Sequence, residues 1–182
     1  FSGTKTELPT ALPPGIQLHS RTDAQALSNA EEVPLGALTA ALAGRVGGLD
    51  TLIIEVTEKT ETPLHIITRS DRDETNFARV AVIVRPGASL DLVESHLGGA
   101  GFSSFLIEIG MQEGGHVRRT VLQKASADEA QAVTAIVSLG DKSEYTQTAL
   151  SFGAHVARLE TRLTHQESGS HATLNGAYLC AD

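Results

Sequence analysis

The chain has 182 residues, enough for one domain that buries about two-thirds or more of its unfolded surface. Its formal net charge of −8, together with a low aromatic content and no tryptophan, argues against nucleic acid or an anionic membrane as the main partner. The single cysteine, Cys180, excludes an internal disulfide framework and fits a reducing compartment, and no apolar run reaches the roughly 18 to 20 residues of a membrane-spanning helix, so we expect a cytoplasmic protein.

Residues 1–50 form a lead-in segment in our interpretation. Prolines break up its first part, which leaves room for one short strand at residues 16–19. An apolar stripe after Pro34 then predicts a short helix, which glycines from Gly44 onward end. The stripe consists of Leu35, Leu38, Ala41 and Leu42.

Residues 51–182 repeat short strand-like segments with turn residues between them, and we assign them to one β core. The segments begin roughly every 11 to 16 residues, and every second segment begins about 25 to 29 residues after its counterpart. Glycine recurs just before several of them. The expected strands are 51–56, 64–68, 78–84, 89–96, 105–109, 117–123, 131–139, 143–150, 155–163 and 170–179.

One segment, GAHVARLETRLTH at residues 153–165, fits two periodicities. Val156, Leu159 and Leu163 have the spacing of one helix face, but the same segment also alternates apolar and charged residues as a half-buried strand does. A helix here would interrupt a regular series of strands, so the strand is favoured. The charged set that would then face water is Arg158, Glu160 and Arg162.

Evenly spaced strands fit either a sandwich or a β-solenoid. A sandwich usually needs tight hairpins, yet Asn-Gly occurs only at Asn175–Gly176, inside an expected strand, and Asp-Gly does not occur. A two-strand period of about 27 residues fits a solenoid whose strands pair in parallel one coil along. We therefore expect a mainly β fold of two flattened sheets with one short helix near the N-terminus.

Alternation within the strands predicts which side chains face the inside. In RPGASLDLVESHL, residues 85–97, Leu90 and Leu92 face inward with the aliphatic part of Glu94, whereas Asp91 and Val93 face outward. The next copy of this pattern has an inward set of Val117, Arg119, Val121 and Gln123. Inward aliphatic side chains would stack in columns, each contributing about 1.5–3 kcal/mol on burial.

Residues 71–75 spell D-x-D-x-T, the nucleophile motif of aspartyl-phosphate phosphatases. That chemistry needs the first aspartate at the tip of a strand, but Arg69 and Ser70 intervene here. The later lysine and the acidic magnesium site of such enzymes are not apparent either. We interpret the motif as a solvated charged turn.

Three histidines follow a glycine and a small residue, and a stacked ladder of imidazoles could bind a metal. The strand alternation instead places His116 and His171 on one sheet, two coils and about 10 Å apart, with His155 on the other sheet. We expect no metal site there, and we interpret Cys180 as a buried, inert thiol. The other strand histidines, which we expect to be hydrogen-bonded structural residues, are His65, His96 and His165.

The stretch 84–123 resembles the core of the SufB/SufD family, the scaffold components of the SUF iron–sulfur cluster assembly system. It carries LDLVE at residues 90–94, EI at 108–109 and HVRRTVLQ at 116–123. Tyr145, GAHVARLE at 153–160 and SHATLNGAY at 170–178 continue the family pattern in order and spacing. The lead-in segment makes the chain most similar to SufD.

The resemblance implies a right-handed parallel β-helix that acts as a non-catalytic scaffold subunit. In this family SufD pairs with SufB, both dock on the ATPase SufC through a helical C-terminal region, and the cluster is assembled transiently on the complex. This chain stops at Asp182, before that region and before the coils that carry the family's proposed cluster ligands. We therefore expect no resident cofactor in the fragment, and no binding of the ATPase by the fragment alone.

Two further expectations concern single positions. The strand edge after Leu179 is unpaired in this interpretation and invites a homodimer. Gln123 and Lys124 match a region where SufB carries polar residues that line its interior. No phosphate-binding loop, zinc-ligand spacing or Ser-His-Asp set is found in the sequence, so we name no catalytic, metal or cofactor-binding residue.

Two other classes stay open. A β-helix enzyme that acts on polysaccharide would need clustered carboxylates on one exposed sheet, and Asp91 and Glu94 are expected to point to opposite faces. A purely structural β-solenoid that binds other proteins is the third class.

Overall fold

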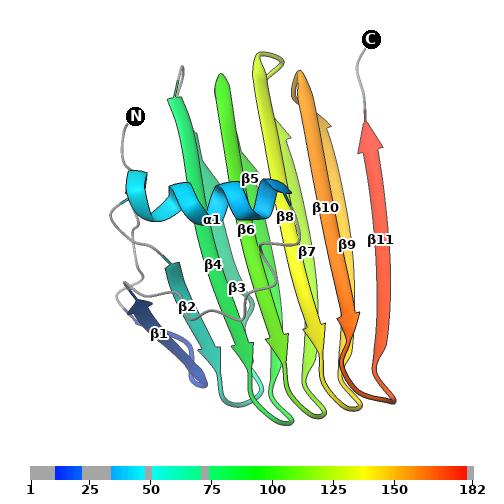
Figure 1. Ribbon diagram of the computed structural model, residues 1–182. Coiled ribbons are helices and arrows are strands. Elements are labelled where there is room, and N and C mark those ends of the chain that lie inside the picture. Colours follow the sequence, from blue (N-terminus) through cyan, green and yellow to red (C-terminus); the bar gives the residue numbers. More distant parts are fainter. Residues whose placement is uncertain (1–10, 22–33, 48–50, 71–73, 180–182) are drawn as a thin grey trace.

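The computed structural model describes residues 11–21, 34–47, 51–70 and 74–179. Among these residues the chain forms two sheets and one helix. Figure 1 shows the sheets stacked on each other, with the helix lying across the outside of one of them. The fold is a mainly β solenoid of about 5 turns with 68% strand, as the repeated strand-like segments predict. Within the described residues, no helix has the length and apolar content needed to cross a membrane.

Each coil of the solenoid places one strand in each sheet. The first sheet has the order β1-β2-β4-β6-β8-β10, and the second has the order β11-β9-β7-β5-β3. Neighbouring strands are parallel, except that β1 runs antiparallel to β2. The first sheet comprises β1 (Ile16–Arg21), β2 (Thr51–Val56), β4 (Glu74–Val84), β6 (Gly101–Met111), β8 (Glu129–Leu139) and β10 (Val156–His165). The second comprises β3 (Leu64–Arg69), β5 (Ser89–Leu97), β7 (His116–Ala125), β9 (Glu144–Gly153) and β11 (His171–Leu179).

The register reproduces the predicted period. Ser89 on β5 lies beside His116 on β7, 27 residues further along the chain. Phe105 on β6 lies beside Val133 on β8, 28 residues further along. Since side chains alternate between the two faces of a strand, this register stacks inward residues of successive coils in columns.

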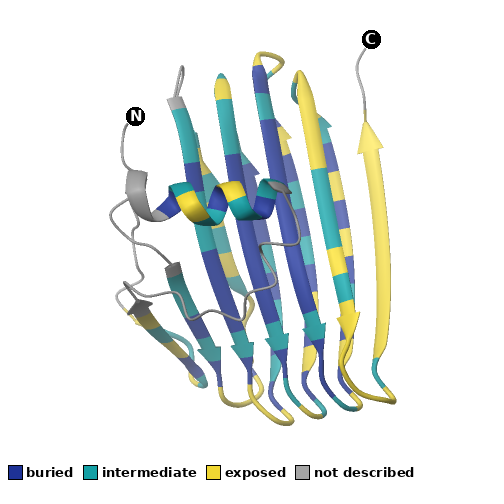
Figure 2. Ribbon diagram, viewed as in Figure 1, coloured by how far each residue is buried: buried dark blue, intermediate teal, exposed yellow. Residues whose placement is uncertain are grey.

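The core between the sheets is built from these aliphatic columns. On β7 buried and more exposed residues alternate, and the inward set begins with Val117 as predicted. Leu90 and Leu92 of β5 are buried in the same core. Figure 2 shows this burial along the central strands, and the core members on the first sheet include Val82, Val84, Ile107, Ile109, Val133, Ala135 and Val137.

The single helix, α1 (Pro34–Gly47), covers the outer face of the first sheet and crosses β4, β6 and β8 (Figure 1). Its buried positions are small, namely Gly36, Thr39 and Ala43, because small side chains allow a close approach to the strands. Thr39 Oγ1 also lies 2.6 Å from Ser104 Oγ of β6. Of the predicted apolar stripe, Leu38 is 45% exposed and Ala41 is exposed, whereas Leu35 and Leu42 are partly buried, so the stripe only borders the face that packs on the sheet.

The segment with two possible periodicities is a strand, β10, as predicted. Leu159 and Leu163 pack against the core, and Arg158 and Arg162 are exposed. Gly153 ends the preceding strand with a φ of +70°, and a Cβ there would lie 2.4 Å from the Ala125 carbonyl oxygen. Glycine is therefore needed at this corner for both its backbone conformation and its close contact.

The two ends of the solenoid differ. At one end β1, within the predicted lead-in segment, extends the first sheet and turns Ile16 into the core. At the other end β10 and β11 are the edge strands of their sheets, and every residue of β11 is exposed (Figure 2). Asn175–Gly176 lies inside β11 and forms no hairpin turn, as the sequence predicts.

Candidate functional site

A charged pair lies inside the solenoid, between β5 and β7. Arg119 donates from Nε to Glu94 Oε1 at 2.6 Å and from Nη2 to Glu94 Oε2 at 2.7 Å. Both side chains have 0% relative exposure. A carboxylate and a guanidinium held by two parallel hydrogen bonds form one of the strongest polar contacts available to side chains.

Strand alternation places this pair inside. Glu94 faces inward from β5 on the same side as Leu90 and Leu92, and its register partner on β7 is Val121. Arg119 lies two positions earlier on β7, beside Leu92. The ion pair therefore crosses diagonally from one coil to the next, and the long arginine side chain spans this offset.

The network extends from Glu94 toward the first coil. His96 Nε2 lies 3.0 Å from Glu94 Oε2, and His96 Nδ1 lies 2.8 Å from Thr68 Oγ1 on β3. The imidazole of His96 is buried and packs at a ring distance of 4.7 Å from Phe105. Each nitrogen of this histidine thus has a polar partner, as expected for a structural histidine.

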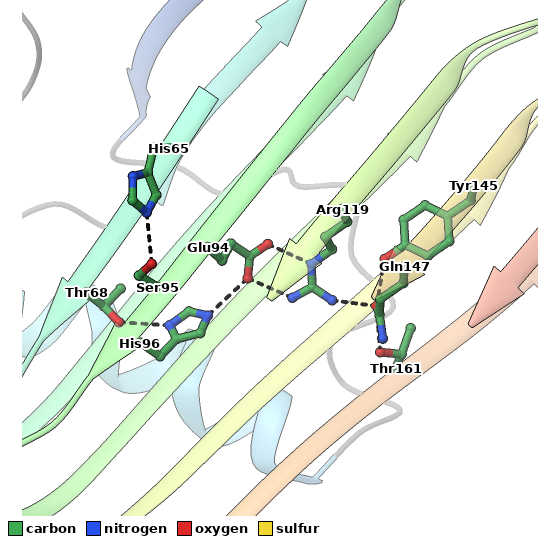
Figure 3. Close-up of polar contacts among 9 residues, drawn as sticks. All are labelled: His65, Thr68, Glu94, Ser95, His96, Arg119, Tyr145, Gln147 and Thr161. Atoms are coloured by element: carbon green, nitrogen blue, oxygen red, sulfur yellow. Dashed lines mark hydrogen bonds and ion pairs between the residues drawn. The ribbon is translucent and has the colours of Figure 1, made fainter. Parts of the chain in front are cut away.

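In the other direction the network reaches the last coils (Figure 3). Arg119 Nη1 donates to Gln147 Oε1 at 2.7 Å. The same oxygen accepts from Tyr145 OH at 2.8 Å and from Thr161 Oγ1 of β10 at 3.1 Å. One continuous chain of polar contacts therefore links β3, β5, β7, β9 and β10 through the interior.

The electrostatics of the pair favour the charged forms. Burial opposes ionisation of Glu94, but the charge and hydrogen bonds of Arg119, with a further contribution from His96, outweigh it and lower the pKa of Glu94 from 4.5 to about 2. Burial likewise opposes the charge on Arg119, yet the negative charge of Glu94 raises the arginine pKa above its usual value. Burial raises the pKa of the Tyr145 hydroxyl, so this group stays neutral.

The pKa shifts of Glu94, Arg119 and Tyr145 limit the chemistry that the network can perform. A carboxylate with a pKa of about 2 is a weak base, and both of its oxygens are occupied by Arg119 and His96. The guanidinium is likewise buried and donates two hydrogen bonds to Glu94 and one to Gln147. Fixed, neutralised charges of this kind hold neighbouring coils in one register.

A second polar group lies at one end of the same interior. Glu129 of β8 is buried, and its Oε1 accepts from Ser70 Oγ at 2.7 Å and from Ser103 Oγ at 2.6 Å. Its Oε2 has no hydrogen-bond partner among the described residues, and neither do Asn76 Nδ2 and Gln131 Oε1. Buried polar atoms without a partner cost free energy, so this end of the interior is less completely hydrogen-bonded than the network around Arg119.

Gln123 belongs to this polar interior, as the family resemblance implies. Its Nε2 donates to the Gln131 carbonyl oxygen at 3.3 Å, and its Oε1 accepts from Ser151 Oγ at 3.0 Å. Lys124 alternates to the outer face of β7 and is exposed, so it does not line the interior.

The three histidines considered as metal ligands are separated as predicted. His116 and His171 lie on the second sheet, where both are register partners of Glu144 on the strand between them. His155 precedes β10 of the first sheet. Among the described residues no group of three or more His, Cys, Asp or Glu side chains could hold a metal ion.

The remaining sequence candidates divide between structural residues and undescribed ones. His65 Nε2 lies 2.9 Å from Ser95 Oγ, and His165 Nδ1 lies 2.7 Å from Ser170 Oγ, so these histidines are hydrogen-bonded as predicted. Residues 71–73 of the D-x-D-x-T motif and Cys180 lie outside the described residues.

Sequence reasoning placed Glu94 and Arg119 on the inner face but missed that they bind each other. It also missed Tyr145 and Gln147 as members of the same network. The available signal was that Glu94 and Arg119, an acid and a base, occupy inward positions of adjacent coils. Gln147 occupies the matching position of the next coil, where it is the register partner of Arg119.

Comparison with known proteins identifies the family of the solenoid domain. A scan against protein-family models matches the SUF system FeS cluster assembly, SufBD core domain over residues 65–182. Searches of curated proteins and of solved structures found no match. Because the family match spans more than half of the sequence, from β3 to the end, the chain belongs to the SufBD core-domain family of the SUF iron–sulfur cluster assembly system.

Proposed function

We propose that the protein is a SufD-like scaffold subunit of the SUF iron–sulfur cluster assembly complex, and that it acts by positioning partners. The observation that carries this proposal is the SufBD core match over residues 65–182, which coincides with the coils of the solenoid. The preference for SufD over SufB rests on the resemblance of residues 1–50 to the SufD lead-in.

The interior network supports a scaffold role. Arg119 links three coils, because it binds Glu94 one coil before it and Gln147 one coil after it. A broken link would leave a charge without a partner in the core, which is costly, so the coils are strongly held in one arrangement. A rigid stack of this kind can hold one partner beside another.

We propose that the chain is not an enzyme and carries no resident cofactor. The iron–sulfur cluster is cargo, assembled transiently on the full complex. Asp91 is half-buried on the outer face and pairs with Arg118, whereas Glu94 is buried on the inner face. The two carboxylates therefore do not form the paired acidic site that a polysaccharide-active β-helix would need, which supports the scaffold role over that alternative.

The partners we propose are a SufB-like sister protein and a SufC-type ATPase, in a cytoplasmic complex. The test is to mix the purified full-length protein with a SufB-like chain, a SufD-like chain and the ATPase in separate combinations. Size-exclusion chromatography with light scattering should give a stoichiometric complex with the SufB-like chain and the ATPase. Preferential pairing with the SufD-like chain would instead assign a SufB-like role.

A second arm tests the competing enzymatic class. Incubation of the same preparation with polygalacturonate should release no reducing ends above the level of a heat-denatured control. Release of reducing ends together with absence of any complex with the ATPase would overturn the scaffold proposal. Absence of both results would leave a structural solenoid outside the SUF complex as the better description.

A further inference from the structure

The outer face of the second sheet carries an apolar surface that we call the apolar ladder. It is formed by Ile67, Leu97, Leu122, Leu150 and Phe152, which alternate outward from β3, β5, β7 and β9. Ile67 is 50% exposed and Leu150 is 37% exposed. These are two of the few large exposed apolar side chains away from the open end of the solenoid.

The register joins these residues into two adjacent rows across the strands. In the first row, Ile67 is followed across the sheet by Ser95, Leu122 and Leu150. In the second row, Arg69 is followed by Leu97, Lys124 and Phe152. Each row crosses the strands near their carboxyl ends, and the apolar residues of the two rows are interspersed with Ser95, Arg69 and Lys124.

The described part of the chain leaves this surface open. The helix α1 packs on the opposite sheet, against β4, β6 and β8 (Figure 1). Apolar side chains that are placed side by side on a sheet face and left in water mark an interaction site more often than scattered ones do.

The charges beside the apolar ladder indicate the sign of its partner. On this outer face Asp91 pairs with Arg118, and Glu144 pairs with His116. Arg69 and Lys124 lie within the second row, are exposed, and form no ion pair with a described residue. An apolar surface bordered by two cations, on a chain whose net charge is −8, complements an acidic partner.

The geometry of the rows suits a helix. From β3 to β9 the first row spans three strand spacings, about 14 Å, which matches nearly three turns of an α-helix. The helix α1 shows this mode of packing on the first sheet, where it crosses the strands and contacts three of them in succession. A helix laid along the apolar ladder would place one side chain per turn between the rows.

We propose that the apolar ladder docks an amphipathic helix of a partner protein, with an apolar face on the ladder and acidic residues beside Arg69 and Lys124. This inference concerns a different surface from the interior network and does not depend on the scaffold role. Binding of this kind would use the outside of the second sheet and leave the solenoid end free.

The test uses a pair of synthetic amphipathic helical peptides of about 18 residues, long enough for a stable helix when stapled. One carries leucines on one face and glutamates along its flanks, and the other has lysine in place of every glutamate. Fluorescence anisotropy with the purified protein should show at least about tenfold tighter binding of the acidic peptide. Lys124→Glu should remove that preference.

Matched variants separate docking from folding. Leu150→Ser should weaken binding of the acidic peptide by about tenfold or more, whereas Thr148→Ser, on the same strand and face, should leave it unchanged. Both variants keep the fold if their denaturation midpoints match the parent protein. Equal binding of the two peptides, an unchanged affinity in Leu150→Ser, or no binding by either peptide would overturn the proposal. Self-association that Leu150→Ser abolishes would instead assign the surface to a second copy of the chain and would also overturn it.

Discussion

Arg119 on β7 binds Glu94 on β5 through two hydrogen bonds, of 2.6 and 2.7 Å, across neighbouring coils of the solenoid interior. Neither side chain has any exposed area, so each depends on the other for its charge compensation. A surface counterpart exists on the same two strands, where Arg118 binds Asp91 on the outer face. The two pairs differ in burial and share their strands, which makes one a control for the other.

We expect Arg119→Leu to lower the free energy of unfolding by about 3–5 kcal/mol, because it leaves the Glu94 carboxylate buried without its cation. Arg118→Leu should leave it nearly unchanged, as is usual for exposed pairs. Urea denaturation followed by circular dichroism measures both values. The double variant Glu94→Leu with Arg119→Leu should recover much of the loss, and equal losses for the two single arginine variants would contradict the role of the buried pair.

The pH dependence of the free energy of unfolding should reflect the titration of Glu94. Its pKa is about 2 in the folded protein and lies near 4.5 in the unfolded chain, so folding favours the ionised form. The resulting stabilisation, on the order of 3 kcal/mol, is fully present above pH 4.5 and is lost as the pH falls toward 2. Urea titrations at pH 6, 4 and 3 should show this loss, and Glu94→Gln should flatten the profile in that interval.

Two glycines with the same backbone conformation should respond differently to alanine. Gly153 and Gly87 have φ values of +70° and +68°. A Cβ at Gly153 would lie 2.4 Å from the Ala125 carbonyl oxygen, whereas a Cβ at Gly87 would meet nothing within 4 Å. Gly87→Ala should therefore cost about 1–2 kcal/mol from backbone strain alone, and Gly153→Ala should cost clearly more. Similar denaturation midpoints for the two variants would show that the corner at Gly153 can relax.

The packing of α1 on the first sheet can be tested with two alanines of the same helix. Ala43 is buried at 1% exposure and Ala41 is exposed. Ala43→Glu should detach the helix or destabilise the protein by several kcal/mol, because it would bury an unpaired charge. Ala41→Glu should be nearly neutral. Hydrogen exchange of the α1 amides distinguishes local detachment from global unfolding, and equal exchange in both variants would contradict the assigned face.

The 182-residue chain should self-associate through β10 and β11, because these are edge strands with unpaired backbone groups among the described residues. Sedimentation velocity should reveal dimers that grow with concentration. Leu174→Lys, which points an added charge inward at this end, should favour the monomer, whereas Thr173→Lys on the outer face of the same strand should not. A strict monomer at high concentration would count against the proposed homodimer.

The fold could be predicted because its main determinant is local and repeated. The alternation from Leu90 to Glu94, and the same pattern about 27 residues later, fixes both the strand faces and the parallel pairing. Segment 153–165 shows the limit of a single window, since its own periodicity was ambiguous and the series of neighbouring strands decided it. Some strands, such as β4 and β6, begin four residues before their predicted start. This is because hydrogen bonding to neighbouring strands continues the ladder beyond the apolar run.

The interior network was only partly accessible to sequence reasoning. Alternation predicts that Arg119 faces inward, but the diagonal contact with Glu94 depends on how far a side chain reaches between coils. The packing face of α1 was also not predicted, since the apolar stripe located the helix while Gly36, Thr39 and Ala43 form its buried side. Close approach to a sheet selects small residues, and hydrophobicity alone does not reveal this.

The reversed direction of β1 has a consequence for how copies of this chain can combine. At the open end both sheets present strands that continue the parallel winding, whereas the far edge of the first sheet is a strand that runs the other way. Copies stacked head to tail would therefore join β10 to the next copy's β1 in antiparallel and β11 to its β3 in parallel, so the two sheets would need different hydrogen-bond patterns at every junction. Two identical open ends related by a twofold axis would instead pair β10 and β11 of both copies and leave β1 and β3 as the outer sheet edges.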